Sequence, residues 1–339
     1  MTKKIKYLLF ILLINLSCDQ KASQRYVPES SGNINTVTVV MSKTFWNGEL
    51  GEQTRNILGA IYEGLPIDEP VFDLKHIEPK HFNDFTRQAR NIIEFAIDST
   101  PGLTMYSDPY AKPQVLAEIK GLDSDEMIFL LEENEKLIKG VFTENEVKEK
   151  RRRISKALSK DRQIQNKFNF QIKYPSAYKI IKDTTNFIWL QKSVMKGHLN
   201  LIVYTIAESA INYKNISKSI IKIRDSIGKI YIPGRLNGSY MITEKAYRPY
   251  YYKTSLENKK TLLTKGTWEV ANDYMAGPFV NYIIEDKTKK RLLVIEGFAF
   301  APSVNKRDYM FELETIICLL YTSDAADEGL GVDLGGRRI

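Results

Sequence analysis

Short apolar runs and amphipathic segments alternate along the first half of the chain. The runs at 36–41 (TVTVVM) and 91–97 (NIIEFAI) are nearly continuous, which is typical of strands buried on both faces. A further strand is predicted at 71–77, and apolar residues from Leu50 to Ile61 recur at helical spacing before it. Strands that alternate with helices are typical of βαβ units, so the pattern predicts a partly parallel sheet with helices.

Two charged helices are predicted to close this first half. Each begins with a capping box, in which a cap residue is followed three positions later by Glu: Asp123 with Glu126, and Thr143 with Glu146. Gly140 is expected to separate the two helices, and the second should end near Gln165. Residues 114–119, which precede them, fit either a strand or the start of a helix.

From about residue 166 the pattern changes to short strands separated by turn residues. The segments from 168 to 207 fit an antiparallel meander, and the runs at 277–286 and 291–300 fit a hairpin. One amphipathic helix is marked by isoleucines from Ile216 to Ile227, and Asn305 is expected to cap a last helix. The whole chain is therefore predicted to be α+β (mixed α/β), and its second domain should carry an antiparallel sheet with helices on one face.

The first eighteen residues have the features of a bacterial lipoprotein signal. Three lysines precede an unbroken apolar run at 7–14, and Ser17–Cys18 follows. This run is far shorter than the ~20 residues that a membrane-spanning helix needs. We interpret residues 1–18 as the signal peptide and Cys18 as the lipidation site. Asn15 stands where such signals usually carry leucine, so an ordinary cleaved signal with a chance cysteine remains the alternative.

The remaining boundaries follow from composition. Residues 19–33 are polar and contain Pro28 and paired serines, so they are predicted to form a flexible tether. Residues 318–339 (CLLYTSDAADEGLGVDLGGRRI) look like the in-frame translation of a sequencing adapter, and we expect this tail to be non-native and outside the fold. A natural flexible tail is the alternative. The body then divides into domains at 34–165 and 166–317, a division that its length favours.

Charge and cysteine content narrow the possible functions. The signal contributes three lysines and the tail a net charge of −2, so the formal +8 of the chain becomes +7 for the body. A mildly basic exported protein is expected to meet anionic lipid, a cell-wall polymer or another envelope protein, and not nucleic acid. The two cysteines are Cys18 and Cys318, so a body at 34–317 contains no disulfide, catalytic thiol or cysteine metal site.

No catalytic or metal-binding motif stands out in the sequence. His76 and His81 are five residues apart with Pro79 between them, so they do not share one helix face, and a surface loop pair is the favoured interpretation. There is no nucleophile elbow and no glycine-rich phosphate loop. Carboxylate pairs such as Glu285 with Glu296 are common on the wet faces of strands. We therefore predict no catalytic residue, no metal and no cofactor. Whether the protein is an enzyme stays open, and a non-catalytic protein is the favoured interpretation.

Aromatic residues in the second half suggest a contact surface. Gly277 and Pro278 are expected to fix a tight bend, which would hold its neighbours in one geometry at low entropic cost. The alternatives are that the bend caps the core and that the tyrosines pack along a strand edge. The candidate contact residues are large and mostly aromatic: Trp46, Tyr250, Tyr251, Tyr274, Met275 and Phe279.

One resemblance extends over much of the chain. The stretch TWEVANDYMAGPFVNYIIEDKTKKRLLVIEGFAFAPSVNKRDYMFELE resembles the signature of an uncharacterised Bacteroidetes lipoprotein family, the domain of unknown function numbered 4837. SSGNINTVTVVM, FWNGELGE and YIPGRLNGSYMITEK resemble its start and middle, so the likeness covers nearly all of 30–317. It implies export, lipidation and residence in the envelope of a Gram-negative bacterium, on the periplasmic face or the cell surface. It assigns no activity to any residue.

The expected function is that of a lipid-anchored envelope protein that binds a partner or supports assembly without catalysis. The alternative is an envelope hydrolase that acts on cell-wall material. A hydrolase needs titratable groups that converge in one cleft. The residues whose positions would decide this are Trp46, Asp273, Glu296 and Arg307.

Overall fold

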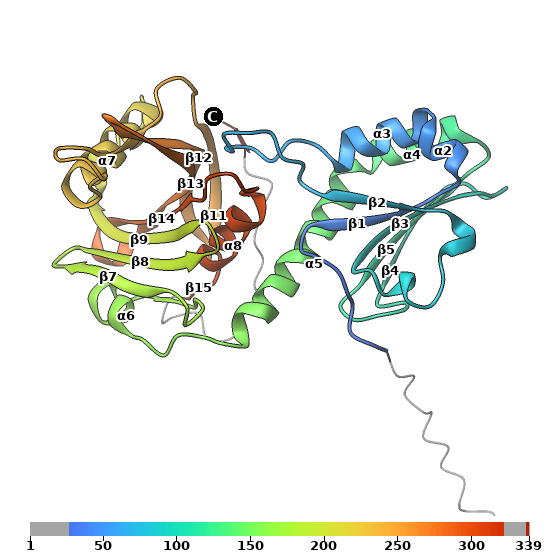
Figure 1. Cartoon of the computed structure of the whole chain (residues 1–339), viewed down its shortest axis with the longest axis horizontal. Helices are drawn as coiled ribbons and strands as arrows, with labels where there is room; N and C mark the ends of the chain where they lie inside the picture. The colour runs from blue at the N-terminus through green and yellow to red at the C-terminus, as the bar shows by residue number, and fades with distance from the viewer. Residues whose placement is uncertain (1–26, 322–336, 339) are drawn as a thin grey trace, which may run out of the picture.

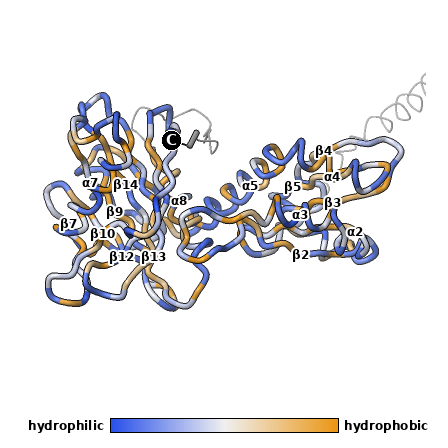
Figure 2. The backbone as a smooth tube through the Cα atoms, turned by 90° about the horizontal axis from the view of Figure 1, so that it is seen from above, coloured by the Kyte–Doolittle hydropathy of each residue, from blue (hydrophilic) through white to orange (hydrophobic). Residues whose placement is uncertain are grey.

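The structure, a computed structural model, describes residues 27–321 and 337–338. Its elements form two lobes, each built on its own sheet, with helix α5 (Glu135–Ser155) between them (Figure 1). The lobes also lie side by side in the view from above (Figure 2). The predicted signal peptide at 1–18, Cys18 and the first part of the tether lie outside the described residues.

The first lobe is built on a five-stranded sheet in the order β2-β1-β3-β5-β4. Its first four strands in this order are parallel, and β4 runs antiparallel to β5. The bounds are β1 Thr36–Val40, β2 Asp73–Ile77, β3 Asn91–Ile97, β4 Gly102–Ser107 and β5 Val115–Gly121. The partly parallel sheet is therefore confirmed. The segment at 114–119, which fitted either a strand or the start of a helix, is a strand. Strand β4 was not predicted, because it is a short, largely exposed edge strand with little apolar pattern.

Helices cover one face of this sheet. They are α2 (Lys43–Asn47), α3 (Glu49–Leu58), α4 (Ser124–Glu133) and the first turns of α5. Apolar side chains of α3, α4 and α5 pack there on alternate residues of the parallel strands. The predicted break at Gly140 is wrong, because α5 continues through it. Ile138 and Phe142 are fully buried on either side, and burial of that size outweighs the ~1 kcal/mol that glycine costs inside a helix.

The second lobe is built on an antiparallel sheet in the order β11-β12-β13-β14-β9-β8-β7. Strands β10 and β11 pair with successive parts of β12, and β16 (Arg337–Arg338) pairs with β11. The bounds are β7 Lys179–Thr184, β8 Phe187–Val194, β9 Gly197–Ala207, β10 Tyr240–Thr243, β11 Tyr250–Leu256, β12 Lys259–Ala271, β13 Asp273–Asp286 and β14 Arg291–Phe300. The predicted α+β class and its antiparallel second sheet are confirmed.

Helices cover both faces of this second sheet, so the expected one-sided arrangement is wrong. Helix α7 (Ile216–Tyr231) packs on one face, over Ile202 and Tyr204. Helices α6 (Gln163–Phe168) and α8 (Arg307–Ile317) pack on the other face with the end of α5. The strands of this sheet are apolar on both sides, as a central layer requires.

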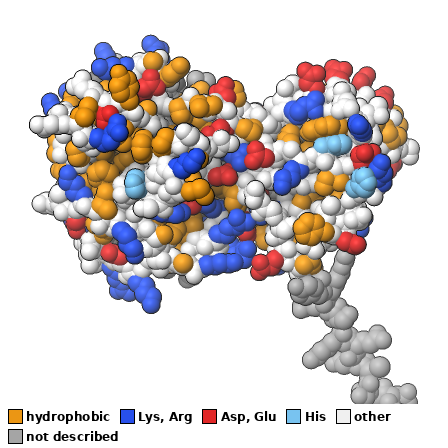
Figure 3. All heavy atoms as spheres, in the orientation of Figure 1, with side chains coloured by type: hydrophobic (Ala, Val, Ile, Leu, Met, Phe, Trp, Pro, Cys, Tyr) orange, Lys and Arg blue, Asp and Glu red, His pale blue; other side chains and the backbone are white. Residues whose placement is uncertain are grey.

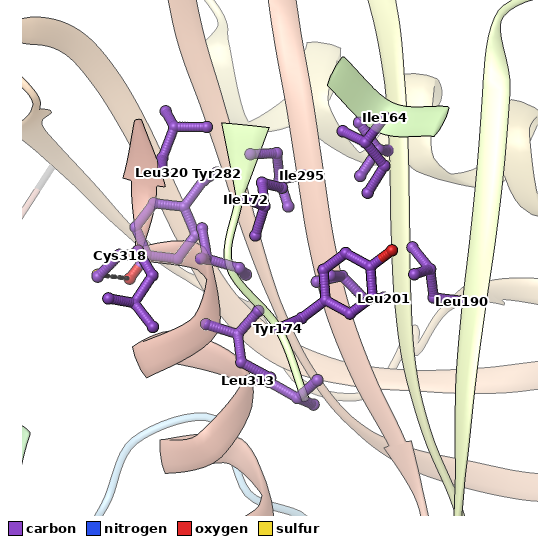
Figure 4. Packing of buried hydrophobic residues seen from close by; sticks show 14 of the residues in the cluster. Ile164, Ile172, Tyr174, Leu190, Leu201, Tyr282, Ile295, Leu313, Cys318 and Leu320 are labelled. Carbon is purple, nitrogen blue, oxygen red and sulfur yellow. Dashed lines mark hydrogen bonds between the residues drawn. The ribbon is translucent and has the colours of Figure 1, made fainter. Parts of the chain in front are cut away.

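The segment after α8 enters the core of the second lobe. Cys318, Leu319 and Leu320 are buried, and β15 (Leu320–Tyr321) pairs with β6 (Gln171–Ile172). Cys318 lies beside Tyr282 in this cluster, with 3.9 Å between the sulfur and the hydroxyl oxygen (Figure 4). Burial raises the pKa of the Cys318 thiol to about 11. The prediction that the fold stops at Ile317 is therefore wrong, because three apolar residues continue the buried face of α8.

A carboxylate from the first lobe caps the last helix of the second lobe. Buried Glu69 accepts hydrogen bonds from the backbone N–H groups of Lys306 at 2.6 Å and Arg307 at 2.9 Å. The Arg307 side chain returns to the first lobe, where it donates to the Pro70 carbonyl and to Asp73. The predicted cap by Asn305 is wrong, because a distant carboxylate satisfies the free N–H groups instead.

A second set of contacts crosses the same junction. Glu314 on α8 accepts from the Tyr62 hydroxyl and from the Lys265 ammonium, whose nitrogen lies 2.8 and 2.9 Å from the two carboxylate oxygens. The Lys265 ammonium also lies over the Tyr62 ring. Tyr252 donates to Glu63 nearby. These contacts attach the segment between α3 and β2 to the second sheet.

In each lobe a buried ion pair joins a helix to a strand or to the residue directly before a strand. In the first lobe, Arg90 donates to Glu146 of α5 at 2.9 Å, and both side chains are almost inaccessible. In the second lobe, Arg224 of α7 forms two bonds with Glu296 of β14, at 2.7 and 2.8 Å. Removing one partner of such a pair leaves a buried charge unpaired, so each pair fixes the position of its helix.

The buried segment after α8 gives a test by truncation. A chain that ends at Ile317 loses Leu319, Leu320 and β15, whereas a chain that ends at Tyr321 keeps them. Losing one buried leucine side chain costs about 2–5 kcal/mol. We expect the shorter chain to melt several degrees lower in a calorimetric scan, since ~1 kcal/mol shifts the Tm of a domain of 150–250 residues by roughly 2–4 °C. Equal melting temperatures would restore the boundary at Ile317.

The cap across the junction gives a second test. Glu69→Ala leaves two buried N–H groups without an acceptor, and bonds to charged groups contribute about 1.5–3 kcal/mol each. We expect the free energy of unfolding, measured by chemical denaturation, to fall by about 2 kcal/mol or more, with a smaller loss for Glu69→Gln. The control is Glu133→Ala on the exposed side of α4, which should stay within ~0.5 kcal/mol. A loss no larger than the control's would mean that the cap is dispensable.

Candidate functional site

The residues predicted to form one contact surface lie in separate parts of the molecule. Trp46 is in α2 of the first lobe, and Tyr250 and Tyr251 begin β11 of the second lobe. Tyr274 and Met275 lie at the start of β13, close to the turn from β12. Cys18 is outside the described residues.

The turn between β12 and β13 is not the one predicted. Asn272 makes the turn with a positive φ of 65°, whereas Gly277 and Pro278 are buried inside β13 and pair with Trp268 and Thr267. Gly277 is required by close packing, because a Cβ there would lie 2.1 Å from the Ala299 carbonyl oxygen. The predicted bend at 277–278 is therefore wrong.

Phe279 does not belong to a contact surface. Its side chain is 1% exposed and packs in the core beneath α7, where the Arg224 guanidinium carbon lies 3.3 Å from its ring centre. Met275 is partly buried against the same core. Phe279 lies well inside β13, where both faces of the sheet are covered, whereas Tyr274 lies at the exposed end of the strand.

Tyr274 is the most exposed large side chain of the six candidates, with a relative exposure of 104%. Beside it, Arg235 donates two hydrogen bonds to Asp273, at 2.7 and 3.1 Å, and these bonds lower the pKa of that carboxyl group. The ion pair holds the segment after α7 against the turn, so the exposed Leu236 lies next to it. We call Arg235, Leu236, Asp273 and Tyr274 the hairpin surface.

Sequence reasoning missed Arg235 and Leu236. The only local signal was a leucine set among turn-forming residues in the stretch YIPGRLNGSY. Their place beside Tyr274 depends on the pairing of β10 with β12, which brings Tyr240 opposite Ala271. Strand pairing of this kind cannot be read from local pattern.

The tyrosines of β11 mainly pack on the sheet. Tyr250 and Tyr251 are both partly buried, and Tyr251 contacts the core beneath α7. Burial raises the pKa of the Tyr251 hydroxyl. The exposed tyrosine of this segment is Tyr247, in the loop before β11. The packed alternative therefore describes Tyr250 and Tyr251 better than the contact surface does.

The residues on which the hydrolase alternative depended do not share a cleft. Glu296 is buried with Arg224, and Asp273 pairs with Arg235 at the hairpin surface. Arg307 lies at the junction of the lobes, and Trp46 lies in α2. Four separate positions cannot form one catalytic centre.

One carboxylate pair lies on the sheet face of the first lobe that the helices leave uncovered. Glu94 of β3 is in register with Glu118 of β5, and burial together with that neighbouring charge raises the pKa of Glu94. Glu118 accepts from the Tyr106 hydroxyl at 3.1 Å and lies 3.4 Å from the Lys120 ammonium. The sequence gave no hint of this pair, because its two members belong to different strands that only sheet pairing brings together.

Two further classes of site receive no support from the described part of the chain. No group of three or more His, Cys, Asp and Glu residues there is arranged to hold a metal ion. Within residues 27–321, no helix is long and apolar enough to cross a membrane.

Two family models match the chain, one for each lobe. Residues 157–318 match a model described as Domain of unknown function (DUF4837), and residues 30–155 match one described as Domain of unknown function (DUF8532). The chain is thus similar to two adjoining domains of unknown function. The resemblance to family 4837 is confirmed for the second half, whereas the first half matches a different family model.

Other comparisons add little. A solved structure described as a protein of unknown function, PA94, from Pseudomonas aeruginosa is 10% identical, with a TM-score of 0.22. The match covers 39% of this chain and 77% of that one, and similarity at this level carries no argument. The comparison with curated proteins gave no match.

Tyr274 and Phe279 provide a matched pair that separates surface from core. Tyr274→Ala should change the free energy of unfolding by less than ~0.5 kcal/mol, because the side chain is fully exposed. Phe279→Ala should lower it by about 3–5 kcal/mol, because it empties a packed position beneath α7. Denaturant titrations of both variants check this, and a large loss for Tyr274→Ala would place that residue in the core.

Proposed function

We propose that this protein is a lipid-anchored protein of a bacterial cell envelope that binds another envelope protein without catalysis. The anchor is Cys18, at the end of a signal-like segment with three lysines and a short apolar run. The binding surface is the hairpin surface of the second lobe. The full exposure of Tyr274 next to the Arg235–Asp273 ion pair is the observation that carries the proposal.

The chemistry of the hairpin surface favours a protein partner. Tyrosine and arginine are enriched among the residues that dominate binding energies, because they combine apolar area with hydrogen-bonding groups. Arg235 is two-thirds exposed, so a partner can reach it. Its two hydrogen bonds to Asp273 hold its side chain in one geometry before any partner arrives. Leu236 and Tyr274 directly follow the two members of that pair in the chain, and both supply exposed apolar area.

The anchor and the hairpin surface belong to different lobes. The first described residues join the first lobe, where Glu29 bridges to Lys112 and Ser31 bridges to Ala89. The hairpin surface lies on the second lobe, joined to the first by α5 and the Glu69 cap. A protein anchored through the first lobe therefore keeps its binding surface free of the attachment point.

Site-specific photocrosslinking in the envelope tests this function. A photoreactive residue at position 274 should give one adduct of discrete mass in the membrane fraction, whereas the same residue at position 247 should not. Tyr247 is the matched control, because it is also an exposed tyrosine of the second lobe. Equal labelling at both positions, or none at either, would remove the hairpin surface as a binding site.

Cys18→Ala tests the anchor in the same cells. The altered protein should stall in processing or move to the soluble fraction, and its adduct at position 274 should decrease with it. Unchanged membrane retention of a processed Cys18→Ala protein would refute lipid anchoring, while leaving the hairpin surface to be judged by crosslinking.

A further inference from the structure

A hollow lies at the carboxyl ends of two parallel strands in the first lobe. It has a volume of about 460 Å³ and is lined by residues of α2, the end of β2 and the segment that follows it, including Lys43, Trp46, Asn47, His76, Glu78 and His81. We call it the β1–β2 hollow. Open sheets with parallel strands bind their ligands outside the carboxyl ends of the strands, at the point where the strand order reverses. Here the order reverses between β1 and β3, so the hollow lies at the ligand-binding end of the sheet, one strand away from that point.

Stacked side chains hold one wall of this hollow in place. The rings of Trp46 and His76 stack with centres 4.8 Å apart and an interplanar angle of 3°. The Arg55 guanidinium lies over the Trp46 ring and donates to the Trp46 carbonyl at 2.9 Å. His76 Nε2 lies 2.9 Å from the Met41 carbonyl oxygen. A carbonyl only accepts, so Nε2 carries a proton and the ring orientation is fixed.

Basic side chains outnumber acidic ones in the lining of the hollow. Histidine side chains are visible on the near face of the first lobe (Figure 3). Lys43, Asn47 and His81 are exposed, and their side chains have no hydrogen-bond or ion-pair partner among the described residues. The acidic residue of the lining is Glu78, which lies 3.5 Å from the ammonium of Lys80. The free groups therefore favour an anion over a cation.

We propose that the β1–β2 hollow binds a phosphate group, carried by a soluble phosphomonoester or by a phospholipid headgroup. Lys43, His76 and His81 come from three segments. A phosphomonoester offers three non-bridging oxygens to three such groups, and a diester headgroup offers two. The Lys43 ammonium supplies the point charge, a role that lysine often has in phosphate sites. The Asn47 amide can donate a further hydrogen bond.

His76 has a defined part in this site. Because Nε2 donates to Met41, only Nδ1 remains for the ligand. Neutral Nδ1 accepts a hydrogen bond from the hydroxyl of a monohydrogen phosphomonoester. Protonated Nδ1 donates one to an unprotonated phosphate oxygen, which is the arrangement that a diester headgroup requires. Either way one hydrogen bond forms and no bond of the ligand breaks. The stack on Trp46 keeps the imidazole in place, which lowers the entropy lost on binding.

This site is independent of the hairpin surface, and calorimetric titration of the full-length protein tests it. The probes are glycerol 3-phosphate, vesicles of phosphatidylglycerol in phosphatidylcholine, and succinate as an anion without phosphate. We expect saturable binding of at least one phosphate probe and none of succinate. Binding of glycerol 3-phosphate identifies a phosphomonoester as the ligand, and binding of the vesicles alone identifies a headgroup.

A matched pair of lysine variants distinguishes binding in the hollow from general electrostatic attraction to the protein. Lys43→Ala should weaken binding at least about tenfold, which corresponds to ~1.4 kcal/mol. Lys75→Ala removes the same charge from β2, where the exposed Lys75 lies outside the lining, and should change the affinity less than about twofold. His76→Gln and His81→Gln should each weaken binding, and an unchanged melting temperature shows that the variants are folded. Equal losses for the two lysine variants, binding of succinate, or no saturable binding of either phosphate probe would overturn the proposal.

Discussion

The attachment of α8 to the first lobe is the constraint on which the rest of the structure depends. A helix begins with N–H groups that have no partner within the helix, and here two of them are bound by Glu69 from a segment more than two hundred residues earlier. The helix then carries Glu312, which accepts from Lys150 of α5 at 2.9 Å and from Lys192 of β8 at 2.6 Å. One helix thus joins the first lobe, the connecting helix and the second sheet.

Much of the fold could be predicted because its strands are unusual in sequence. The central strands of both sheets are buried on both sides and read as nearly continuous apolar runs, and such runs stand out without any tertiary knowledge. The predictions failed where packing outweighs local preference. Gly140 lies inside a helix because its neighbours are buried, and Gly277 lies inside a strand because another backbone comes too close for a side chain.

The candidate sites were predictable only in part, for a related reason. Tyr274 and Trp46 could be singled out by residue type, but their partners come from other segments. Arg235 reaches the hairpin surface through strand pairing, and His76 reaches Trp46 because β2 lies beside β1. Phe279 was assigned to the surface although it is buried, because the bend predicted at 277–278 placed it next to a turn. The turn is instead at Asn272, five residues earlier than the predicted bend.

Helix α5 sets the distance between the two lobes. It has 21 residues, which at 1.5 Å per residue amounts to about 31 Å. Its first two turns are buried in the core of the first lobe through Ile138 and Phe142, and its last turn is buried in the core of the second through Ile154. A spacer whose ends are both part of a core has a fixed length and a fixed direction. The separation between the β1–β2 hollow and the hairpin surface is therefore a constant of the molecule, unlike the varying distance that a flexible linker would give.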